Sequence, residues 1–334
     1  MSNEYKRTGV LPVLVVFAPT ASGKTALGVE LFGKDSPSPF AGKGEIISAD
    51  SMQVYKGMDI GTAKPDSHTL EQVPHHLIDV QTPDVPFSVG EFVRQGDVLC
   101  QEIYQRNKIP VVLGGTGFYI RNFLVGLPPT PQADEKLRHH LKDRLATEGA
   151  GVLYRELETL DPATAAIIHP NDEYRIVRAL EVCIASGKPR SSFILSPQFR
   201  EGFDFCVIIL QRDREELYNR IAQRVDIMFD QGLAAEVENL IAAGYTPEDP
   251  GMQAIGYREF FAPEVALLQG EERLNRIKEL ITRNSRHYAK RQYTYMKGIP
   301  RAAYFHPDDM TGIQNFITPF MQKYIGMESI DYQK

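Results

Sequence analysis

The sequence predicts an α/β protein in which a mostly parallel sheet is flanked by helices and interrupted by a helical insertion domain. Three observations support this prediction. An apolar run, residues 13–17, is followed by a loop of small residues and then by a helical pattern. Short β-rich runs alternate with helical stretches as far as residue 125, as in parallel sheets. From residue 126 to residue 199 the pattern becomes helical with charged faces.

The loop after the first predicted strand has the spacing of a Walker A motif, in which backbone N–H groups and a lysine bind phosphate oxygens. The N-terminus of the next predicted helix, residues 24–32, attracts anions as well. We therefore expect a P-loop NTPase-like core with a phosphate-binding loop. One residue departs from the motif, because alanine stands first where glycine is usual, and alanine fits only if its φ is not positive. The loop consists of Ala18, Pro19, Thr20, Ala21, Ser22, Gly23, Lys24 and Thr25.

The predicted sheet continues through three further β-rich runs, residues 45–49, 77–80 and 109–113, with a helix over residues 89–106. A parallel sheet binds its ligands beyond the carboxyl ends of the strands. The residues that follow each strand should therefore face one crevice.

Two segments follow these strands directly. Asp50 ends the second strand and is the candidate general base, although a lone aspartate at a strand end is more often a helix cap. Residues 114–117, Gly-Gly-Thr-Gly, could be a tight turn or a helix start. Glycine rather than aspartate follows this strand, which disfavours a motor-type ATPase. The absence of an Asn-Lys-x-Asp tetrapeptide disfavours a GTPase.

A proline-rich segment, residues 127–131, marks the start of the predicted insertion. We expect a core domain of residues 10–125 and 200–330 and an insertion domain of residues 126–199. Helical periodicity within the insertion covers residues 134–146, 152–159, 163–168 and 173–186.

The chain returns to the sheet with a predicted strand at residues 205–210, and helices follow from residue 214. In the first of these helices Arg220 and Arg224 lie one turn apart. They could clamp a diphosphate or form a surface ion pair.

Composition sets the outer limits. The net charge of -6 argues against a uniformly basic nucleic-acid binder. The three cysteines lie far apart, so we expect neither a disulfide framework nor a zinc site, and a cytoplasmic location. No stretch approaches the 18 or so apolar residues of a membrane span, and we expect no signal peptide. His75 and His76 are adjacent and favour packing over metal binding.

Positive charge is concentrated near the C-terminus. Residues 273–301 contain nine Lys or Arg residues against one acid, with three tyrosines between them. Several of these cations recur at three- and four-residue steps and share one face of a helix. This face could follow a phosphate backbone or could simply be a solvated surface.

The run Ser-Ala-Asp-Ser-Met-Gln-Val-Tyr-Lys-Gly-Met-Asp-Ile-Gly-Thr-Ala-Lys-Pro, residues 48–65, resembles the signature of tRNA dimethylallyltransferases, also called tRNA prenyltransferases. The resemblance covers about residues 13–297. Ala18 departs from the family pattern, as does Tyr295-Met296, where the family often has Trp and an aliphatic or aromatic residue. The chain lacks the zinc-finger extension of eukaryotic relatives, so we expect a bacterial-type enzyme. Further segments match in order at residues 75–79, 114–119, 175–182, 253–257, 282–283 and 288–292.

The resemblance implies transfer of a five-carbon group from dimethylallyl diphosphate to the exocyclic amine, N6, of the adenosine 3′ to the anticodon. The expected acceptors are tRNAs that read codons beginning with U, and diphosphate is released. The Ala18 to Thr25 loop would bind the diphosphate, with Mg²⁺ near Thr25. Thr20 and Arg224 would act on the leaving group, and Asp50 would accept the amine proton.

The same resemblance implies an anticodon stem-loop as partner, no membrane, and a monomeric enzyme. The target base must leave its stack to be reached. Residues expected around this base are Asp50, Ser51, Met52, Gln53, Thr116, Gln253, Gly256 and Tyr257. The insertion would bind the anticodon loop through Arg138, Tyr174, Arg175 and Arg178. The basic helix would bind stem phosphates through Arg283, Lys290 and Arg291.

Other functions share these features. A nucleotide or small-molecule kinase would have the same phosphate loop and a strand-end aspartate, and ATP consumption separates it from a prenyltransferase. A non-catalytic nucleotide-binding RNA module would transfer no prenyl group. Cytokinin-forming relatives of the family prenylate free adenine nucleotides, and the predicted RNA-binding insertion and basic helix favour tRNA instead.

Overall fold

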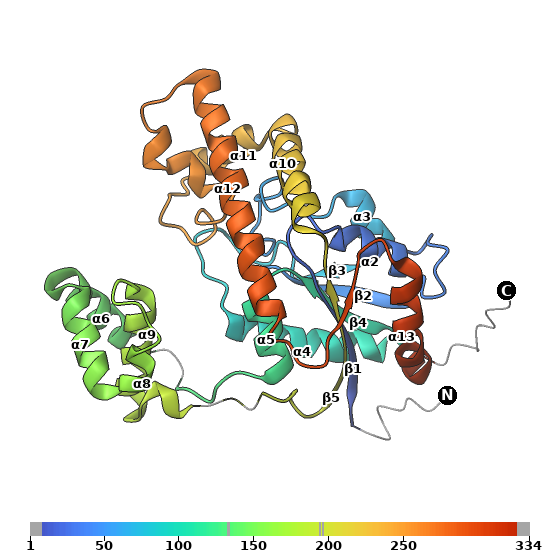
Figure 1. Cartoon of the computed structure of the whole chain (residues 1–334), viewed down its shortest axis with the longest axis horizontal. Coiled ribbons are helices and arrows are strands. Elements are labelled where there is room, and N and C mark those ends of the chain that lie inside the picture. Colours follow the sequence, from blue (N-terminus) through green and yellow to red (C-terminus); the bar gives the residue numbers. More distant parts are fainter. Residues whose placement is uncertain (1–8, 132–133, 194, 196, 326–334) are drawn as a thin grey trace. The chain divides into compact units, whose positions relative to one another are not determined.

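The computed structural model describes residues 9–131, 134–193, 195 and 197–325. The chain divides into two compact units, one formed by Met1–Leu124 with Gln198–Lys334 and the other by Val125–Pro197. The first unit contains the sheet, and the second is helical in its described part (Figure 1). Among the described residues no helix combines the length and the apolar character needed to cross a membrane.

A six-stranded sheet forms the centre of the first unit, in the order β3-β2-β4-β1-β5-β6. Every neighbouring pair is parallel, so the predicted mostly parallel sheet is confirmed. Its first strand is buried along its whole length, as expected when helices cover both faces of a sheet. The strands are β1 (Leu11–Phe17), β2 (Gly44–Ala49), β3 (His75–His76), β4 (Ile109–Gly114), β5 (Phe203–Leu210) and β6 (Ala303–Phe305).

The third strand is a correction to the sequence prediction. A strand was expected at residues 77–80, but β3 is His75–His76. Leu77 and Asp79 have φ angles of 62° and 55°, in the left-handed region that an extended strand excludes. The apolar run therefore lies in a turn beyond the sheet.

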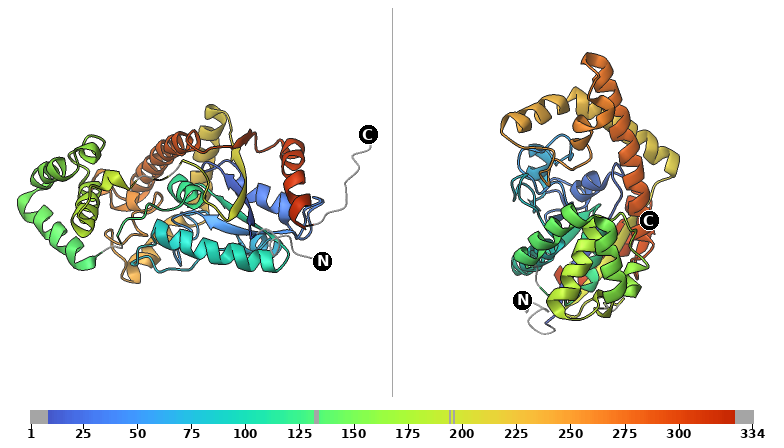
Figure 2. Two further views of the ribbon diagram at one scale, coloured as in Figure 1. Left: turned by 90° about the horizontal axis from the view of Figure 1, so that it is seen from below. Right: turned by 90° about the vertical axis from the view of Figure 1, so that its left-hand side faces the viewer.

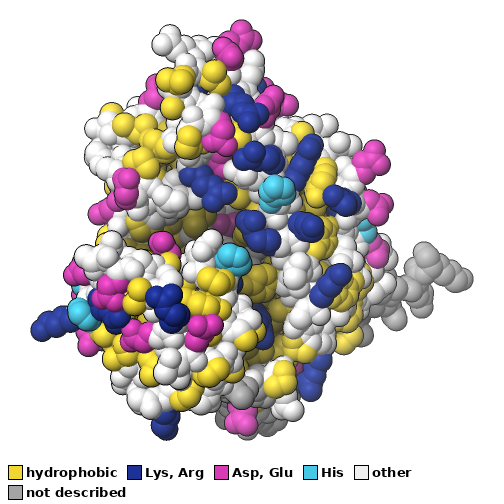
Figure 3. Space-filling view, turned by 60° about the vertical axis from the view of Figure 1, so that its left-hand side comes forward, with side chains coloured by type: hydrophobic (Ala, Val, Ile, Leu, Met, Phe, Trp, Pro, Cys, Tyr) yellow, Lys and Arg dark blue, Asp and Glu magenta, His cyan; other side chains and the backbone are white. Residues whose placement is uncertain are grey.

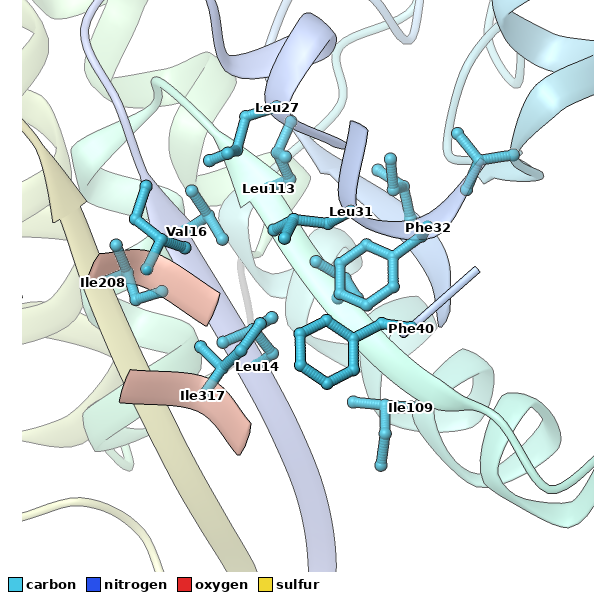
Figure 4. Close-up of a cluster of buried hydrophobic side chains, with 14 of the residues drawn as sticks. Leu14, Val16, Leu27, Leu31, Phe32, Phe40, Ile109, Leu113, Ile208 and Ile317 are labelled. Carbon is cyan, nitrogen blue, oxygen red and sulfur yellow. The ribbon is translucent and has the colours of Figure 1, made fainter. Parts of the chain in front are cut away.

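One face of the sheet is covered by two helices, α2 (Lys24–Phe32) and α13 (Met310–Ile325). Figure 4 shows their side chains meeting those of the central strands, for example Leu27 beside Leu113 and Ile317 beside Leu14. These residues are almost wholly buried. This core anchors the strand that leads into the phosphate loop.

The other face of the sheet is covered by α4 (Val89–Gln105), as Figure 2 shows. Ser88 caps this helix by accepting the N–H of Glu91. The remaining elements of the unit are α3 (Ser67–Gln72), α5 (Gly117–Val125), α10 (Arg214–Asp230), α11 (Leu233–Ala242) and α12 (Gly270–Met296), with short 3-10 helices at Arg258–Phe261 and Pro263–Val265.

The described residues of the second unit form four α-helices around a small apolar core. Aspartates cap three of them, and the helix over residues 173–186 has its predicted bounds. Leu141, Leu153 and Leu180 are fully buried in this core. The helices are α6 (Glu135–Glu148), α7 (Ala150–Leu160), α8 (Pro162–Ala165) and α9 (Glu173–Ser186), followed by a 3-10 turn at Arg190–Ser192.

Candidate active site

The phosphate loop connects β1 to α2 in the way its sequence predicts. Gly23 has a φ of 98° and stands immediately before the helix, a conformation that favours glycine. Ala21 is also left-handed, with a φ of 60°. Ala18 is not among the residues with positive φ, so alanine fits where the motif usually has glycine.

Two arginines hold this loop from outside. Arg212 lies two residues after the end of β5 and donates its Nε to the carbonyl of Ser22 at 2.9 Å. Arg220, on α10, donates its Nε to the carbonyl of Ala21 at 2.8 Å. Because carbonyls of successive loop residues are bound, the loop is kept in one conformation. The N–H groups of Ala18, Thr20 and Ser22 have acceptors within the protein, so the N–H groups at the start of α2 are the ones available to a ligand.

Three charged side chains meet at the carboxyl ends of β1 and β2. Burial lowers the pKa of Lys24, and the nearby carboxylate of Asp50 partly offsets this effect. Burial likewise lowers the pKa of Arg224, again against the effect of Asp50. Arg224 also donates to the hydroxyl of Thr20 at 3.2 Å. The surface ion pair considered for Arg224 is therefore not what this structure contains.

Asp50 does not cap a helix, because the next helix, α3, begins only at Ser67. Its Oδ1 accepts the N–H of Met52 at 3.0 Å, which fixes the carboxylate at the end of the strand. The side chain remains partly exposed and lines the same cavity as Lys24 and Arg224. Such a carboxylate is well placed to accept a proton.

The Gly-Gly-Thr-Gly segment brings α12 close to the sheet. A Cβ added to Gly115 would lie 2.4 Å from Nε2 of Gln292, and one added to Gly117 would lie 2.6 Å from Cβ of Tyr295. The segment therefore contains both the end of β4 and the start of α5. Because its glycines have no side chains, α12 can pack closely against it. Thr116 accepts the N–H of Ser51 on its hydroxyl at 3.0 Å, which joins this segment to the residues after β2.

A cavity of about 240 Å³ opens between these loops and the helices α10 and α12. The phosphate loop lines one part of this cavity, and the residues after β2 line another. Apolar side chains of α10, such as Ile221 and Val225, complete it. The polar residues that line it are Thr20, Lys24, Asp50, Ser51, Thr62, Arg224, Gln253, Arg258, Ser285, Tyr288, Arg291 and Gln292.

The signature segment, residues 48–65, is held by one carboxylate. Glu236 of α11 accepts the N–H groups of Asp59, Ile60 and Gly61 at 2.8–3.2 Å. It also accepts the hydroxyl of Tyr257 at 2.6 Å. Gly61 is required here, because an added Cβ would lie 2.4 Å from the Tyr257 ring.

Some residues expected around the target base have protein partners instead. Gln53 is buried, accepts the hydroxyl of Ser48 and donates to the carbonyl of Ala63. Tyr257 is fully buried, and Gly256 packs against Gly61 with a φ of 106°. The structure gives these three residues supporting contacts, so their contact with a base stays a prediction. Asp50, Ser51, Met52 and Gln253 do line the cavity.

Within the helical unit the four residues expected to bind RNA fall into two pairs. Arg138 and Arg178 both pair with the buried carboxylate of Glu181, at 3.2 and 3.0 Å. Tyr174 is 82% exposed, and its neighbour Arg175 is exposed too. The exposed pair could contact an RNA base directly, since aromatic rings and guanidinium planes both stack on unpaired bases.

The basic helix is α12, and some of its cations form ion pairs whereas others do not. Arg276 pairs with Glu279 and Lys278 with Asp226. Lys290 and Arg291 are exposed, and in the described part of the chain neither pairs with a carboxylate. Figure 3 shows Lys and Arg side chains gathered on one face of the molecule. Such a face suits a phosphate backbone.

The histidine pair has structural partners. His76 Nε2 lies 2.9 Å from Glu45 Oε2, and His75 Nδ1 lies 2.8 Å from the carbonyl of Val73. Packing, not metal binding, therefore explains them. Elsewhere in the described residues Glu216, His306 and Asp308 cluster, but Arg212 already pairs with both carboxylates. All three cysteines are free thiols.

Sequence reasoning missed two residues of the site. Arg212 lies two residues after the end of β5, so the rule that ligands gather beyond strand ends could have found it. Gln292 was part of a matched segment but had no assigned role. Its spacing of four residues from Tyr288 places both on one face of α12, which was the available signal.

Comparison with known proteins identifies the family. The family model described as IPP transferase matches residues 53–299. The chain belongs to the IPP transferase family. The predicted transferase class is thereby confirmed, and the kinase alternative is not supported.

Members of the IPP transferase family resemble this chain over most of its length. A tRNA dimethylallyltransferase of Geotalea uraniireducens is 46% identical over 85% of this chain and 89% of its own. The crystal structure of a tRNA isopentenylpyrophosphate transferase from Staphylococcus epidermidis is 35% identical, covers 94% of this chain and 99% of its own, and has a TM-score of 0.62. A eukaryotic dimethylallyltransferase acting on tRNA is 26% identical, with coverages of 97% and 81% and a TM-score of 0.75.

Proposed function

We propose that the protein transfers a dimethylallyl group from dimethylallyl diphosphate to N6 of the adenosine 3′ to the anticodon, in tRNAs that read codons beginning with U. Diphosphate is the second product. One observation carries the proposal: a phosphate loop, the carboxylate of Asp50 and the side chain of Arg224 line a single cavity bordered by a basic helix. The names of the relatives support tRNA as the acceptor.

The phosphate loop would bind the diphosphate of the donor. The N–H groups at the N-terminus of α2 offer donors, and Lys24 adds a charge. Lys24 is buried, and burial disfavours its charged form. The negative charge of a bound diphosphate would stabilise that charged form. The C–O bond to the diphosphate breaks during transfer, and negative charge builds on its oxygens. Lys24 and Arg224 then stabilise the transition state more than the ground state.

The acceptor amine would approach from the side of Asp50. N6 forms a bond to the allylic carbon as the C–O bond breaks, and the amine then carries one proton too many. Oδ2 of Asp50, which has no hydrogen-bond partner among the described residues, accepts that proton, whereas Oδ1 accepts the N–H of Met52. Tyr288, Ser51 and Met52 line the cavity beside Asp50 and would surround the flipped base.

Mg²⁺ fits the donor set around the loop. Thr25 offers a half-buried hydroxyl at the start of α2, the position from which phosphate loops bind this ion. Mg²⁺ usually keeps several waters and takes its other ligands from substrate phosphates, so one protein hydroxyl is sufficient. Bound there, the ion would supply charge to the leaving diphosphate.

The RNA would be held by exposed residues of both units. Arg283, Lys290 and Arg291 are exposed on α12 and suit stem phosphates. Tyr174 and Arg175 are exposed on α9 and suit the unpaired loop. We propose that residues 126–199 form an RNA-binding domain and that residues 10–125 and 200–330 form the core domain. We also propose that the enzyme is monomeric and cytoplasmic, where bacterial tRNA is modified.

The test is incubation of the protein with labelled dimethylallyl diphosphate and bulk tRNA. We expect label in the RNA and one diphosphate released for each label incorporated. Replacing the donor with ATP should give no RNA-dependent ADP. Stoichiometric ADP formation, or release of diphosphate without labelled RNA, would contradict the proposed transfer.

A further inference from the structure

Gln292 connects two loops of the site through a single side-chain amide. The residue is 2% exposed and lies on the inner face of α12. Its Oε1 accepts the N–H of Thr20 at 3.0 Å, and its Nε2 donates to the carbonyl of Gly115 at 2.7 Å. Both ends of the amide are thus committed, each to a different loop.

The two loops need such a connection because the sheet ends before them. The phosphate loop follows β1 and the 114–117 segment follows the neighbouring β4, and a hydrogen bond from Ala18 N–H to Gly114 O is the last between their backbones. Beyond that point the two loops are joined by the side-chain amide of Gln292, which bonds to both. Gly115 has no side chain at the place where the amide approaches, since an added Cβ would lie 2.4 Å from Nε2.

The amide also determines where the Thr20 hydroxyl lies. With its backbone N–H bound to Gln292, Thr20 accepts a hydrogen bond from Arg224 on its Oγ1 at 3.2 Å. Thr20, Arg224 and Gln292 all line the cavity. We propose that Gln292 is a positioning residue for the transfer, which fixes Thr20 and, through Thr20, holds Arg224 against the leaving diphosphate. This inference rests on the proposed function.

The position of Gln292 in the sequence adds a consequence. It directly follows Lys290 and Arg291, whose side chains are exposed, although that of Arg291 also borders the cavity. Removing the Gln292 amide leaves those cations in place. A defect caused by Gln292 should therefore appear in the use of the prenyl donor and not in RNA affinity.

The experiment compares three variants of the full chain. Gln292→Met keeps the length of the side chain and removes both hydrogen bonds. Gly115→Ala keeps both polar groups but displaces the amide. Gln314→Met is the matched control, a half-buried glutamine on α13 that does not line the cavity. Each variant is assayed for kcat and KM with dimethylallyl diphosphate, for anticodon stem-loop affinity and for its thermal unfolding midpoint.

We expect Gln292→Met and Gly115→Ala each to lower kcat/KM for the donor by about 10- to 100-fold, as the loss of two buried hydrogen bonds implies. Stem-loop affinity should stay within about twofold, and Gln314→Met should match the wild type. The double variant should be no worse than the worse single variant, because both changes break one contact. An additive loss would contradict the shared contact.

A folded Gln292→Met enzyme with kcat/KM within about twofold of wild type would overturn the proposal, and so would an equal loss of stem-loop affinity. If Gln292→Met does not fold, Gly115→Ala decides by the same criteria. If the wild type transfers no prenyl group at all, the proposed function has failed, and calorimetry with inorganic diphosphate then decides for Gln292. Weaker diphosphate binding by the variant supports its role in the loop, and equal binding overturns it.

Discussion

Two groups of cations in this protein differ in their surroundings. Lys24 at the start of α2 and Arg224 on α10 line the cavity, and Arg212 holds the phosphate loop; all three are withdrawn from solvent and close to partners. Lys290 and Arg291 are exposed on α12. Charges withdrawn from water act strongly at short range, whereas exposed charges act over longer distances and are screened by salt. From this difference we propose that the inner group acts on the chemical step and the outer group on RNA capture.

The largest effect is expected from removing the carboxylate of Asp50, which lies near Lys24 and Arg224 of the inner group. Asp50→Asn should slow prenyl transfer by about 10²- to 10⁴-fold, because an amide cannot accept the amine proton. The asparagine oxygen can still accept the N–H of Met52, so the loop should persist. The measurement is single-turnover transfer, with RNA affinity expected within a few-fold of wild type. Asp84→Asn, at an exposed position, is the control.

Near-normal turnover by Asp50→Asn would remove Asp50 from the role of general base. The inner cations would then act on the diphosphate alone.

Lys24→Ala tests the inner group itself. We expect about 10²- to 10³-fold slower transfer, since a buried charge at the leaving group acts mainly in the transition state. Lys34→Ala, an exposed lysine beyond the end of α2, serves as the control. Rates are measured at low and high salt. A defect of Lys24→Ala that varies steeply with salt would place this lysine with the outer group.

Glu45 tests whether a buried charge cluster far from the cavity is only structural. Burial raises the pKa of Glu45, but hydrogen bonds from Arg106, His76 and Lys108 outweigh burial and lower it to about 2. The ordinary value is 4.5, so the stability that Glu45 contributes is present above pH 4.5 and is lost as the pH falls toward 2.

Glu45→Gln should therefore lower the free energy of unfolding by about 2–3 kcal/mol at pH 7, with little change in kcat. The deficit should shrink as denaturation is repeated at lower pH. Glu71→Gln, at an exposed position, is the control. A deficit that is the same at pH 7 and pH 3 would show that the charge of Glu45 is not what stabilises the fold.

Substitutions in the outer group should give the smallest effect, a change in the salt dependence of RNA affinity. This effect separates the outer group from the inner group. Lys290→Ala or Arg291→Ala should reduce the slope of log RNA affinity against log salt by up to about one for each lost phosphate contact. Single-turnover transfer to RNA at a saturating RNA concentration should change little for Lys290→Ala, whose side chain does not line the cavity. An unchanged slope for both variants would show that the stem phosphates lie elsewhere.

The sequence predicted the parts of the site that depend on local pattern. The phosphate loop, the strand-end position of Asp50 and the helices of the second unit all follow from spacing and periodicity. The family resemblance added Gln53 and Tyr257 but could not tell a residue that faces RNA from one that supports a loop. Burial decides this, and burial depends on tertiary packing. Gln292 escaped notice for the same reason, since its partners are 272 and 177 residues away.

The central claim is that the acceptor is an unpaired adenosine in a tRNA loop, and one assay tests it directly. Prenyl transfer is measured to an anticodon stem-loop, to the same stem with its loop base-paired, and to AMP. The open stem-loop should be the only good acceptor, because the target base must leave its stack and the exposed cations of α12 need a phosphate backbone. If AMP is as good an acceptor as the open stem-loop, the enzyme prenylates free nucleotides and the assignment to tRNA is wrong.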